Sequence, residues 1–141
     1  MIERKDIHLK IFLPSSPTQV YWYISTDAGR EKFWVEKSTT RGDLLLLEFP
    51  NGMSTKSEVL SVIEDKLYEI DYFGSNTTFE LEEHLDGTTV HVRTAVSPDE
   101  FTEVHSGWTS VLLNLKAVIL GQTDLRNHHP IRNWDNQYVD N

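Results

Sequence analysis

The chain has 141 residues, of which 38% are hydrophobic, 25% are charged and none is cysteine, and its formal net charge is −9 at pH 7. This length favours one domain, and this composition is typical of a folded globular protein. The absence of cysteine excludes disulfides, thiolate metal sites and cysteine nucleophiles. Nucleic-acid binding requires a basic stripe, whereas the basic residues cluster only at Arg4-Lys5 and at Arg30 with Lys32, so we expect no nucleic-acid partner.

No apolar run approaches the roughly 20 residues that a membrane-spanning helix needs, because the longest covers only residues 44–47. Residues 1–6 lack the apolar stretch and the cleavage site of a signal peptide. We therefore expect a cytoplasmic protein with no membrane insertion.

The N-terminal part of the chain predicts one strand and two short helices. Apolar residues alternate with polar ones over residues 7–13, which indicates a half-buried strand. Ser16-Pro17 is typical of a helix start, because serine caps free N–H groups and proline suits the first helical position. A helix over residues 17–25 follows, and Thr26 is placed to cap a second helix over residues 27–33.

From Trp34 to Val96 the pattern is one of short alternating strands separated by turn signals. The strands that follow the turn at residues 41–43 are predicted at residues 44–49, 55–63, 67–73, 77–85 and 88–96. Asn51-Gly52 and Asp86-Gly87 are hairpin signatures, because these residues tolerate positive φ. Strands joined by such short turns run antiparallel, so we expect a meander with one apolar face.

Ser97, Pro98 and Glu100 form a predicted capping box for a long helix that ends at Leu120, with Gly121 as its left-handed stop. At 1.5 Å per residue this helix is about 34 Å long. Its apolar stripe consists of His105, Trp108, Leu112, Leu115 and Ile119. The element order β-α-α-β6-α predicts an α+β fold in which a curved antiparallel sheet wraps around the long C-terminal helix.

Gly107-Trp108 together with residues 111–116 closely resembles the closing helix of a known family. This family is the activator-of-heat-shock-ATPase-homologue (AHSA)-like branch of the START/polyketide-cyclase (SRPBCC) superfamily. Residues 77–81 are similar to its penultimate strand, and residues 124–127 resemble an extension of a bacterial subgroup. The resemblance covers about residues 5–121 and implies a helix-grip (START-like, Bet v-like) fold. It assigns no catalytic residue, because that family shares no catalytic residue set.

In a helix-grip fold, the strongly bent sheet leaves room that the helix does not fill. Aromatic walls with a few polar tips are typical of small-molecule pockets. The expected ligand-binding residues are Trp34, Phe49, Tyr68, Tyr72, Phe79, His105, Trp108, Leu112 and Leu115. Simple core packing is the alternative interpretation for most of these side chains.

Among six histidines, only His105 shares the apolar stripe of the long helix, which makes it the one candidate acid or base. The alternative is a solvated histidine at the wet end of that helix. His8, His84 and His91 fall on the polar side of their strands, so we expect them to be exposed.

Metal binding and cofactor binding are not expected from the sequence. His128 and His129 lie near Asp124 and Asp135 but lack the helical spacing of a metal motif. No nucleophile motif and no phosphate-binding glycine loop is present. We therefore predict no metal site, no cofactor and no assigned catalytic residue.

Residues 1–121 are predicted to form a single START-like domain, followed by a C-terminal extension over residues 122–141. The extension carries Trp134, Tyr138 and Val139, which are bulkier than the side chains of a disordered tail usually are. We expect it to pack on its own domain or across a homodimer, with Trp134 as its anchor.

The leading interpretation is a binding protein for a small, mainly apolar molecule held between the sheet and the C-terminal helix. One alternative is a cyclase or hydrolase that uses the same cavity for orientation and His105 for proton transfer. The other alternative is an interaction protein that associates with a chaperone.

Overall fold

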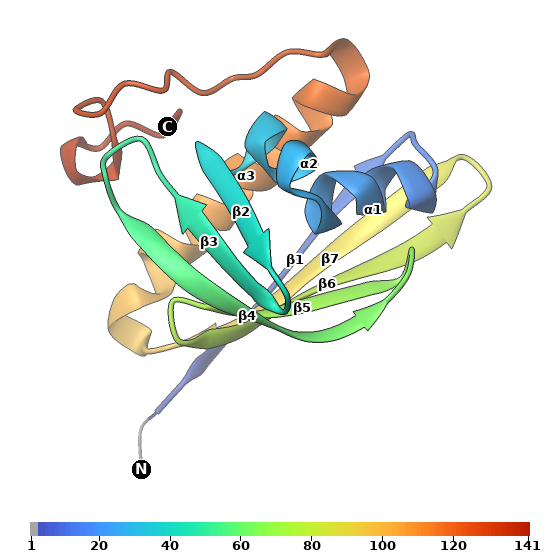
Figure 1. Ribbon diagram of the computed structural model, residues 1–141, viewed down its shortest axis with the longest axis horizontal. Helices are drawn as coiled ribbons and strands as arrows, with labels where there is room; N and C mark the ends of the chain where they lie inside the picture. The colour runs from blue at the N-terminus through green and yellow to red at the C-terminus, as the bar shows by residue number, and fades with distance from the viewer. Residues whose placement is uncertain (1–2) are drawn as a thin grey trace.

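In the computed structural model, which describes residues 3–141, seven strands form one antiparallel sheet around a long helix (Figure 1). In chain order the elements are β1 (Lys5–Leu13), α1 (Pro17–Ser25), α2 (Asp27–Phe33), β2 (Lys37–Arg41), β3 (Leu44–Glu48), β4 (Ser54–Ile63), β5 (Leu67–Tyr72), β6 (Ser75–His84), β7 (Gly87–Val96), the 3-10 turn η1 (Pro98–Glu100), α3 (Phe101–Gly121) and the 3-10 turn η2 (Trp134–Asn136). The strands lie in the order β1-β7-β6-β5-β4-β3-β2, so the first strand pairs with the last. The predicted order β-α-α-β6-α and the α+β helix-grip fold are confirmed.

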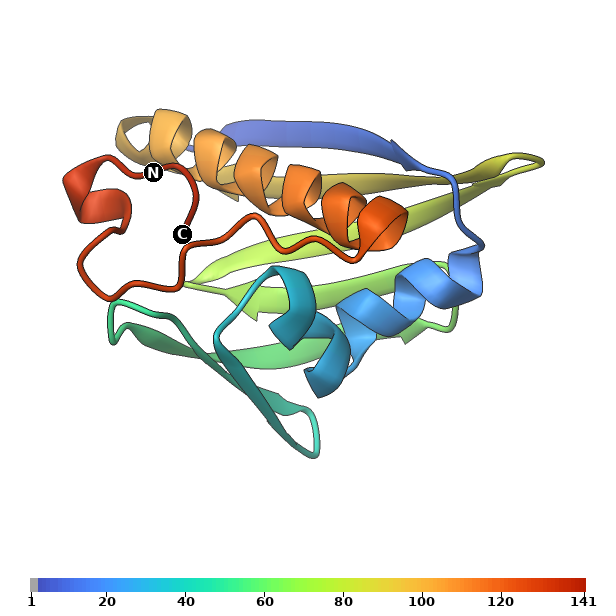
Figure 2. The ribbon, with the colours of Figure 1, turned by 90° about the horizontal axis from the view of Figure 1, so that it is seen from above.

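The sheet bends at β4, which pairs with a different strand in each of its halves. Residues 54–58 pair with β3, whereas Val59 to Ile63 pair with β5. The register shifts between Val59 and Ser61, and a bulge of this kind bends a strand and increases its twist. The curved sheet holds α3 on its concave side, along β1, while α1 and α2 cover the neighbouring part of that side (Figure 2).

The helices α1 and α2 begin at the predicted capping residues. Ser16 accepts a hydrogen bond from the N–H of Gln19 at 3.2 Å, and Thr26 accepts one from the N–H of Gly29 at 2.9 Å. The two helices approach so closely at Gly29 that a Cβ there would collide with the Trp22 carbonyl oxygen. This contact fixes the corner between them.

Three aromatic rings form the centre of the core between the sheet and α3. Trp34 follows α2, Phe79 comes from β6 and Trp108 comes from α3, and each pair of rings lies 5.4 to 5.6 Å apart between centroids. All three side chains are buried. Aromatic rings at such separations in tilted or edge arrangements stabilise a core beyond the area that they bury.

The start and the end of α3 differ from the sequence prediction. Ser97 makes no capping hydrogen bond through its side chain, because residues 98–100 form η1 and α3 begins only at Phe101. The left-handed residue is Gln122, with φ of 53°, rather than Gly121. The N–H of Gln122 bonds to carbonyls of the last helical turn, so the helix includes Gly121 and closes one residue later than predicted.

Two hairpin turns also differ from the prediction. Asn51-Gly52 belongs to a longer loop over residues 49–53, in which only Gly52 has positive φ. The second turn consists of Leu85 and Asp86, because Gly87 is already paired with His84 in the sheet. In both cases the strand register, and not the turn dipeptide, decides which residues connect the strands.

The predicted basic pair at Arg30 is corrected by the structure, because the Arg30 side chain is fully buried. Its guanidinium donates hydrogen bonds to Asp27, Ser38 and Thr40 at 2.9 to 3.1 Å, and to the Tyr68 hydroxyl at 3.4 Å. Desolvation opposes ionisation of Asp27, but hydrogen bonds from Ser38, Thr40 and Arg30 lower the pKa of that carboxyl. Arg30 therefore joins α2 to β2 and β5 and does not contribute to a basic surface.

Replacing Arg30 with methionine is expected to reduce the free energy of unfolding by about 3 kcal/mol, because several buried polar groups lose their partner. Lys32→Met is the matched control, since Lys32 is exposed on the same helix. Its effect is expected to stay within about 0.5 kcal/mol. Urea denaturation of both variants measures the difference, and equal effects would show that the Arg30 network does not stabilise the fold.

Candidate functional site

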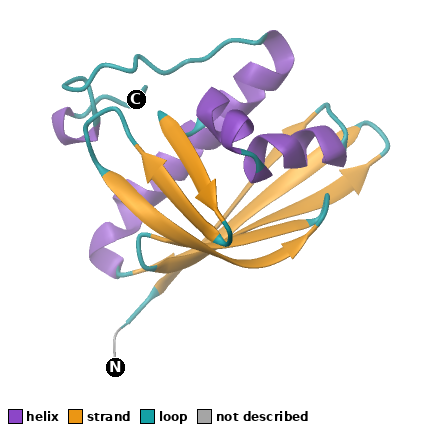
Figure 3. Ribbon diagram, viewed as in Figure 1, coloured by secondary structure: helices purple, strands orange, loops and turns teal. Residues whose placement is uncertain are grey.

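A cavity of about 450 Å³ lies where the extension (residues 122–141) passes alongside α3. The extension leaves the C-terminal end of α3 and runs back along the helix toward the loop between β3 and β4 (Figure 2). Apart from η2 it has no helix or strand (Figure 3). The cavity walls come from the end of α2, the loop at residues 49–53, the turn between β5 and β6, α3 and the extension.

Three aromatic side chains form the inner wall of the cavity. Tyr72 lies 5.4 Å from Trp34 and 5.4 Å from Trp108 between ring centroids, and the indole N–H of Trp34 donates to the Tyr72 hydroxyl at 3.4 Å. The Tyr72 side chain faces the cavity and is half-buried by its exposed area. Its phenol group nevertheless lies deep in the protein, and this desolvation raises the pKa of the phenol. The phenol, which is neutral at physiological pH even with an ordinary pKa near 10, is thus kept still further from ionisation.

Exposed apolar side chains surround the mouth of the cavity. Each of them is at least half exposed and also lines the cavity: Met53, Phe73, Leu113, Leu125 and Val139. They come from four different segments of the chain. An apolar rim of this kind is typical of a binding site, because folded proteins seldom gather exposed apolar groups without a partner.

The structure divides eight of the nine expected ligand-binding residues, all except His105, into two groups. Those that line the cavity are Trp34, Phe49, Tyr72 and Trp108. Those that lie in the core without lining it are Tyr68, Phe79, Leu112 and Leu115. Phe73 and Met53 also line the cavity but were not predicted, because their only sequence signal is a bulky apolar side chain next to a turn glycine.

His105 does not line the cavity. It is half-buried and packs against the ring of Phe101, with 5.6 Å between ring centroids. The α3 side chains that do line the cavity near it include Glu103, Val104 and Trp108. Only part of the predicted apolar stripe therefore lines the cavity, and His105 lies outside that part.

The buried carboxamide of Asn114 attaches the extension to the domain. Its amide N–H groups donate to the Phe33 carbonyl at 2.9 Å and to the Asp124 carboxylate at 3.0 Å. Its oxygen accepts the N–H of Leu125 at 2.7 Å. One side chain of α3 therefore contacts both the end of α2 and the start of the extension.

Arg126 provides a second attachment. Its guanidinium donates to the carbonyl oxygens of Glu31 and Val35, each at 2.8 Å, and pairs with Asp124 at 3.0 Å. Desolvation opposes ionisation of Asp124, but hydrogen bonds from Arg126, His128 and Asn114 hold the pKa of its carboxyl far below the usual range. The only cationic side chain that lines the cavity among residues 3–141 is therefore already neutralised.

His128 lies between two carboxylates, those of Glu36 and Asp124. Its Nδ1 is 2.6 Å from Glu36 and its Nε2 is 2.7 Å from Asp124. The hydrogen bond to Glu36, followed by the one to Asp124, raises the pKa of His128. Within residues 3–141, no group of three or more His, Cys, Asp or Glu side chains is arranged to hold a metal ion.

Trp134 packs on α3 opposite Gly107, where a Cβ would lie 3.8 Å from the indole ring. Gly107 lies within the continuous helix α3, and a Cβ at this position would make an ordinary van der Waals contact with the ring. Trp134 is half-buried, whereas its neighbour Asn133 is buried and donates to the Pro130 carbonyl at 2.7 Å. Both apolar and polar contacts therefore stabilise the position of the extension.

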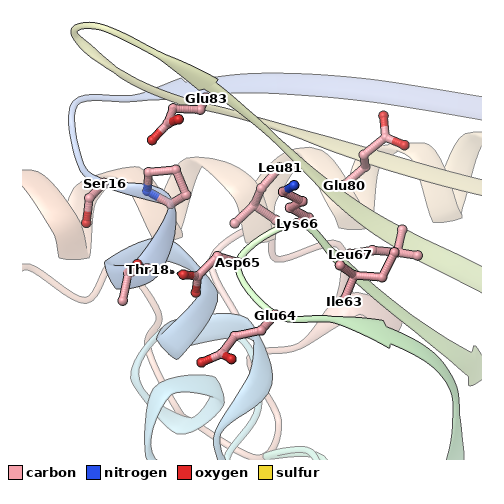
Figure 4. Close-up of a pocket in the computed structure, with 11 residues that line it drawn as sticks. Ser16, Thr18, Ile63, Glu64, Asp65, Lys66, Leu67, Glu80, Leu81 and Glu83 are labelled. Carbon is pink, nitrogen blue, oxygen red and sulfur yellow. Dashed lines mark hydrogen bonds between the residues drawn. The ribbon is translucent and has the colours of Figure 1, made fainter.

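A second hollow, of about 640 Å³, lies at the start of α1 (Figure 4). Four carboxylates surround it, from Glu64, Asp65, Glu80 and Glu83, and Asp65 accepts a hydrogen bond from Thr18 at 2.7 Å. No aromatic side chain lines it among the described residues. The smaller cavity beside the extension is therefore the better candidate for a small apolar molecule.

The comparisons with known proteins support the fold. No protein-family model matches the chain, and no curated protein matches it. A solved structure of SSP2350 from Staphylococcus saprophyticus matches with a TM-score of 0.75 and 17% identity over 84% of this chain and 94% of that one. The Aha1 dimer from Colwellia psychrerythraea matches with a TM-score of 0.72 and 24% identity, over 84% of this chain and 99% of that one. CalU16 from Micromonospora echinospora matches with a TM-score of 0.69 and 20% identity, over 86% of this chain and 78% of that one.

These neighbours show that the chain shares its fold with the SSP2350, Aha1 and CalU16 structures, in agreement with the helix-grip fold that the resemblance implied. Identities at this level establish the fold alone, so the function has to be argued from the site. No helix within residues 3–141 is long and apolar enough to cross a membrane.

The attachment of the extension is expected to weaken as the pH rises. Because the pKa of His128 is raised above 6.5 in the folded protein, its stabilising contribution is complete below that pH and is lost as the pH rises through the folded-state value. Hydrogen exchange of residues 127–141, corrected for intrinsic rates, should therefore show stronger protection at pH 6 than at pH 8. His128→Gln should remove this dependence, and His105→Gln should keep it. A dependence that survives in His128→Gln would contradict the assignment.

Replacing Trp134 with alanine is expected to lower the melting temperature by roughly 4 °C, because a half-buried indole on α3 is lost. Hydrogen exchange should become faster throughout residues 127–141. Tyr138→Ala is the control, since that side chain is exposed. If the extension of the unmutated protein exchanges as fast as free peptide, the proposed attachment is wrong.

Proposed function

We propose that the protein binds a small, mainly apolar molecule in the cavity beside the extension. The observation that carries this proposal is the combination of an inner aromatic wall, from Trp34, Tyr72 and Trp108, with an exposed apolar rim. The cavity volume of about 450 Å³ falls within the range of about 300–1,000 Å³ that is typical of small-molecule sites.

The geometry supports binding better than proton transfer. The enzymatic alternative assigned His105 as the acid or base, and that side chain packs on Phe101 outside the cavity. The titratable groups that do line the cavity include Tyr72, whose pKa is raised by burial, and carboxylates of α3 and the extension. A cyclase or hydrolase mechanism has no positioned base among the residues predicted for it.

A homodimer is a further proposal, and the Aha1 dimer supports it. The attachment of the extension does not depend on a second copy, because the partners of Asn114, Arg126 and His128 all belong to the same chain. Light scattering during size-exclusion chromatography measures the mass in solution. Removal of the extension contacts by Asn114→Ala should then leave the oligomeric state unchanged.

The binding proposal is tested with a variant that fills the cavity. Val111 lines the cavity on α3, so Val111→Trp should occupy the space of a ligand. Leu120→Trp is the matched control, because Leu120 is exposed on the same helix and does not line the cavity. A panel of small aromatic and aliphatic compounds should raise the melting temperature of the unmutated protein and of Leu120→Trp. For Val111→Trp, the affinities should fall at least tenfold.

Native mass spectrometry of protein purified without additives provides an independent measurement. A co-purified mass that is absent from Val111→Trp would support the proposal. If no compound shifts the melting temperature and no mass co-purifies, or if Val111→Trp binds as the unmutated protein does, the proposal is wrong.

A further inference from the structure

The inner wall of the cavity contains one hydroxyl whose proton has no acceptor. The oxygen of Tyr72 accepts the indole N–H of Trp34, and among residues 3–141 no group accepts the proton of Tyr72 itself. A phenol both donates and accepts, so this donor is free for a molecule in the cavity. Tyr68, four positions earlier on the same strand, likewise accepts a hydrogen bond, from the Arg30 guanidinium at 3.4 Å, but it does not line the cavity.

This donor is neutral at physiological pH, as a phenol with an ordinary pKa near 10 is, and burial keeps it further from ionisation. The pKa of Tyr72 is raised by desolvation, which outweighs the hydrogen bond from Trp34. A neutral phenol surrounded by aromatic rings donates well to a carbonyl or ether oxygen. A buried donor that stays unpaired is unfavourable, so a ligand without an acceptor loses affinity.

The charged groups around the cavity disfavour anions. Glu103 of α3 and Asp135 and Asp140 of the extension all line it. The one guanidinium that lines it, from Arg126, is paired with Asp124 and with two backbone carbonyls. A carboxylate in the cavity would lose part of its hydration and, among residues 3–141, would find three negative charges and no free cation, which is unfavourable.

We propose that the ligands of this cavity are uncharged molecules with an apolar aromatic or alicyclic body and one hydrogen-bond acceptor, and that Tyr72 selects them by donating to that acceptor. The body of the ligand lies against Trp34 and Trp108, and its carbonyl or ether oxygen takes the Tyr72 proton. Carboxylates with the same body are rejected. This inference rests on the proposed binding function and specifies the chemical class of its ligand.

Three compounds with one common body test the proposal: 2-acetylnaphthalene, 2-ethylnaphthalene and 2-naphthoate. They differ in the group that would reach Tyr72, which is a ketone, an ethyl group of similar size or a carboxylate. Isothermal titration at pH 7.5 should give about tenfold tighter binding of the ketone than of the hydrocarbon, because one buried hydrogen bond is gained. The carboxylate should bind at least tenfold more weakly than the ketone.

Tyr72→Phe should abolish the preference for the ketone over the hydrocarbon to within about twofold, while binding of 2-ethylnaphthalene stays nearly unchanged. Tyr68→Phe is the control, since Tyr68 is a buried phenol that does not line the cavity. It should retain the preference. Glu103→Gln combined with Asp135→Asn should strengthen binding of 2-naphthoate and leave binding of the ketone unchanged.

The outcomes separate this inference from the function on which it rests. If all three compounds bind alike, or if the carboxylate binds best, the ligand class is wrong while the binding function stands. The same holds if Tyr72→Phe keeps the preference for the ketone. If none of the three binds and no mass co-purifies with the protein, both proposals fall. Should Tyr72→Phe not fold, the order of affinities in the unmutated protein decides the class by itself.

Discussion

The amide of Asn114 is the contact on which the arrangement of the site depends. A buried carboxamide must have its hydrogen bonds satisfied, and the groups that satisfy this one come from the end of α2 and from the start of the extension. This requirement places Leu125 beside α3 and turns the extension back along the helix. The outer wall of the cavity therefore follows from a polar constraint in the core, and the apolar residues of the extension only complete it.

Beyond this attachment, the extension is organised by hydrogen bonds within itself. The N–H of Asn127 donates to the carbonyl of Asp140, and the side chain of Asn141 donates to the carbonyls of His129 and Arg132. Residues 127–141 thus form a closed loop of the compact kind that packs on its own side chains. This loop rests on α3 through Trp134, whereas residues 124–126 are attached through Asn114 and Arg126.

The sequence predicted the parts of the structure that depend on local spacing. The bounds of α1 and α2 are as expected, and the alternation in β7 places Val90 and Val92 in the core. It did not predict the buried roles of Arg30 and Asn114, because the burial of a polar side chain depends on partners that are distant in the chain. His105 shows the same limit for helices, since a shared stripe does not specify which of its members faces a cavity and which faces a neighbouring ring.

The position of the cavity follows from the way the two ends of β5 are covered. Tyr68 and Tyr72 point to the same side of the strand, and four residues at about 3.3 Å each place them about 13 Å apart. At the Tyr68 end, α1 and α2 cover the sheet, and Arg30 and Tyr21 occupy the space around the phenol. At the Tyr72 end, α3 is joined only by the end of α2 and the short turn η2 among residues 3–141, and loops provide the rest of the cover. A loop fills space less completely than a packed helix. The two tyrosines on the same side of β5 therefore have different surroundings: Tyr68 is enclosed beside Arg30, whereas Tyr72 faces the open cavity.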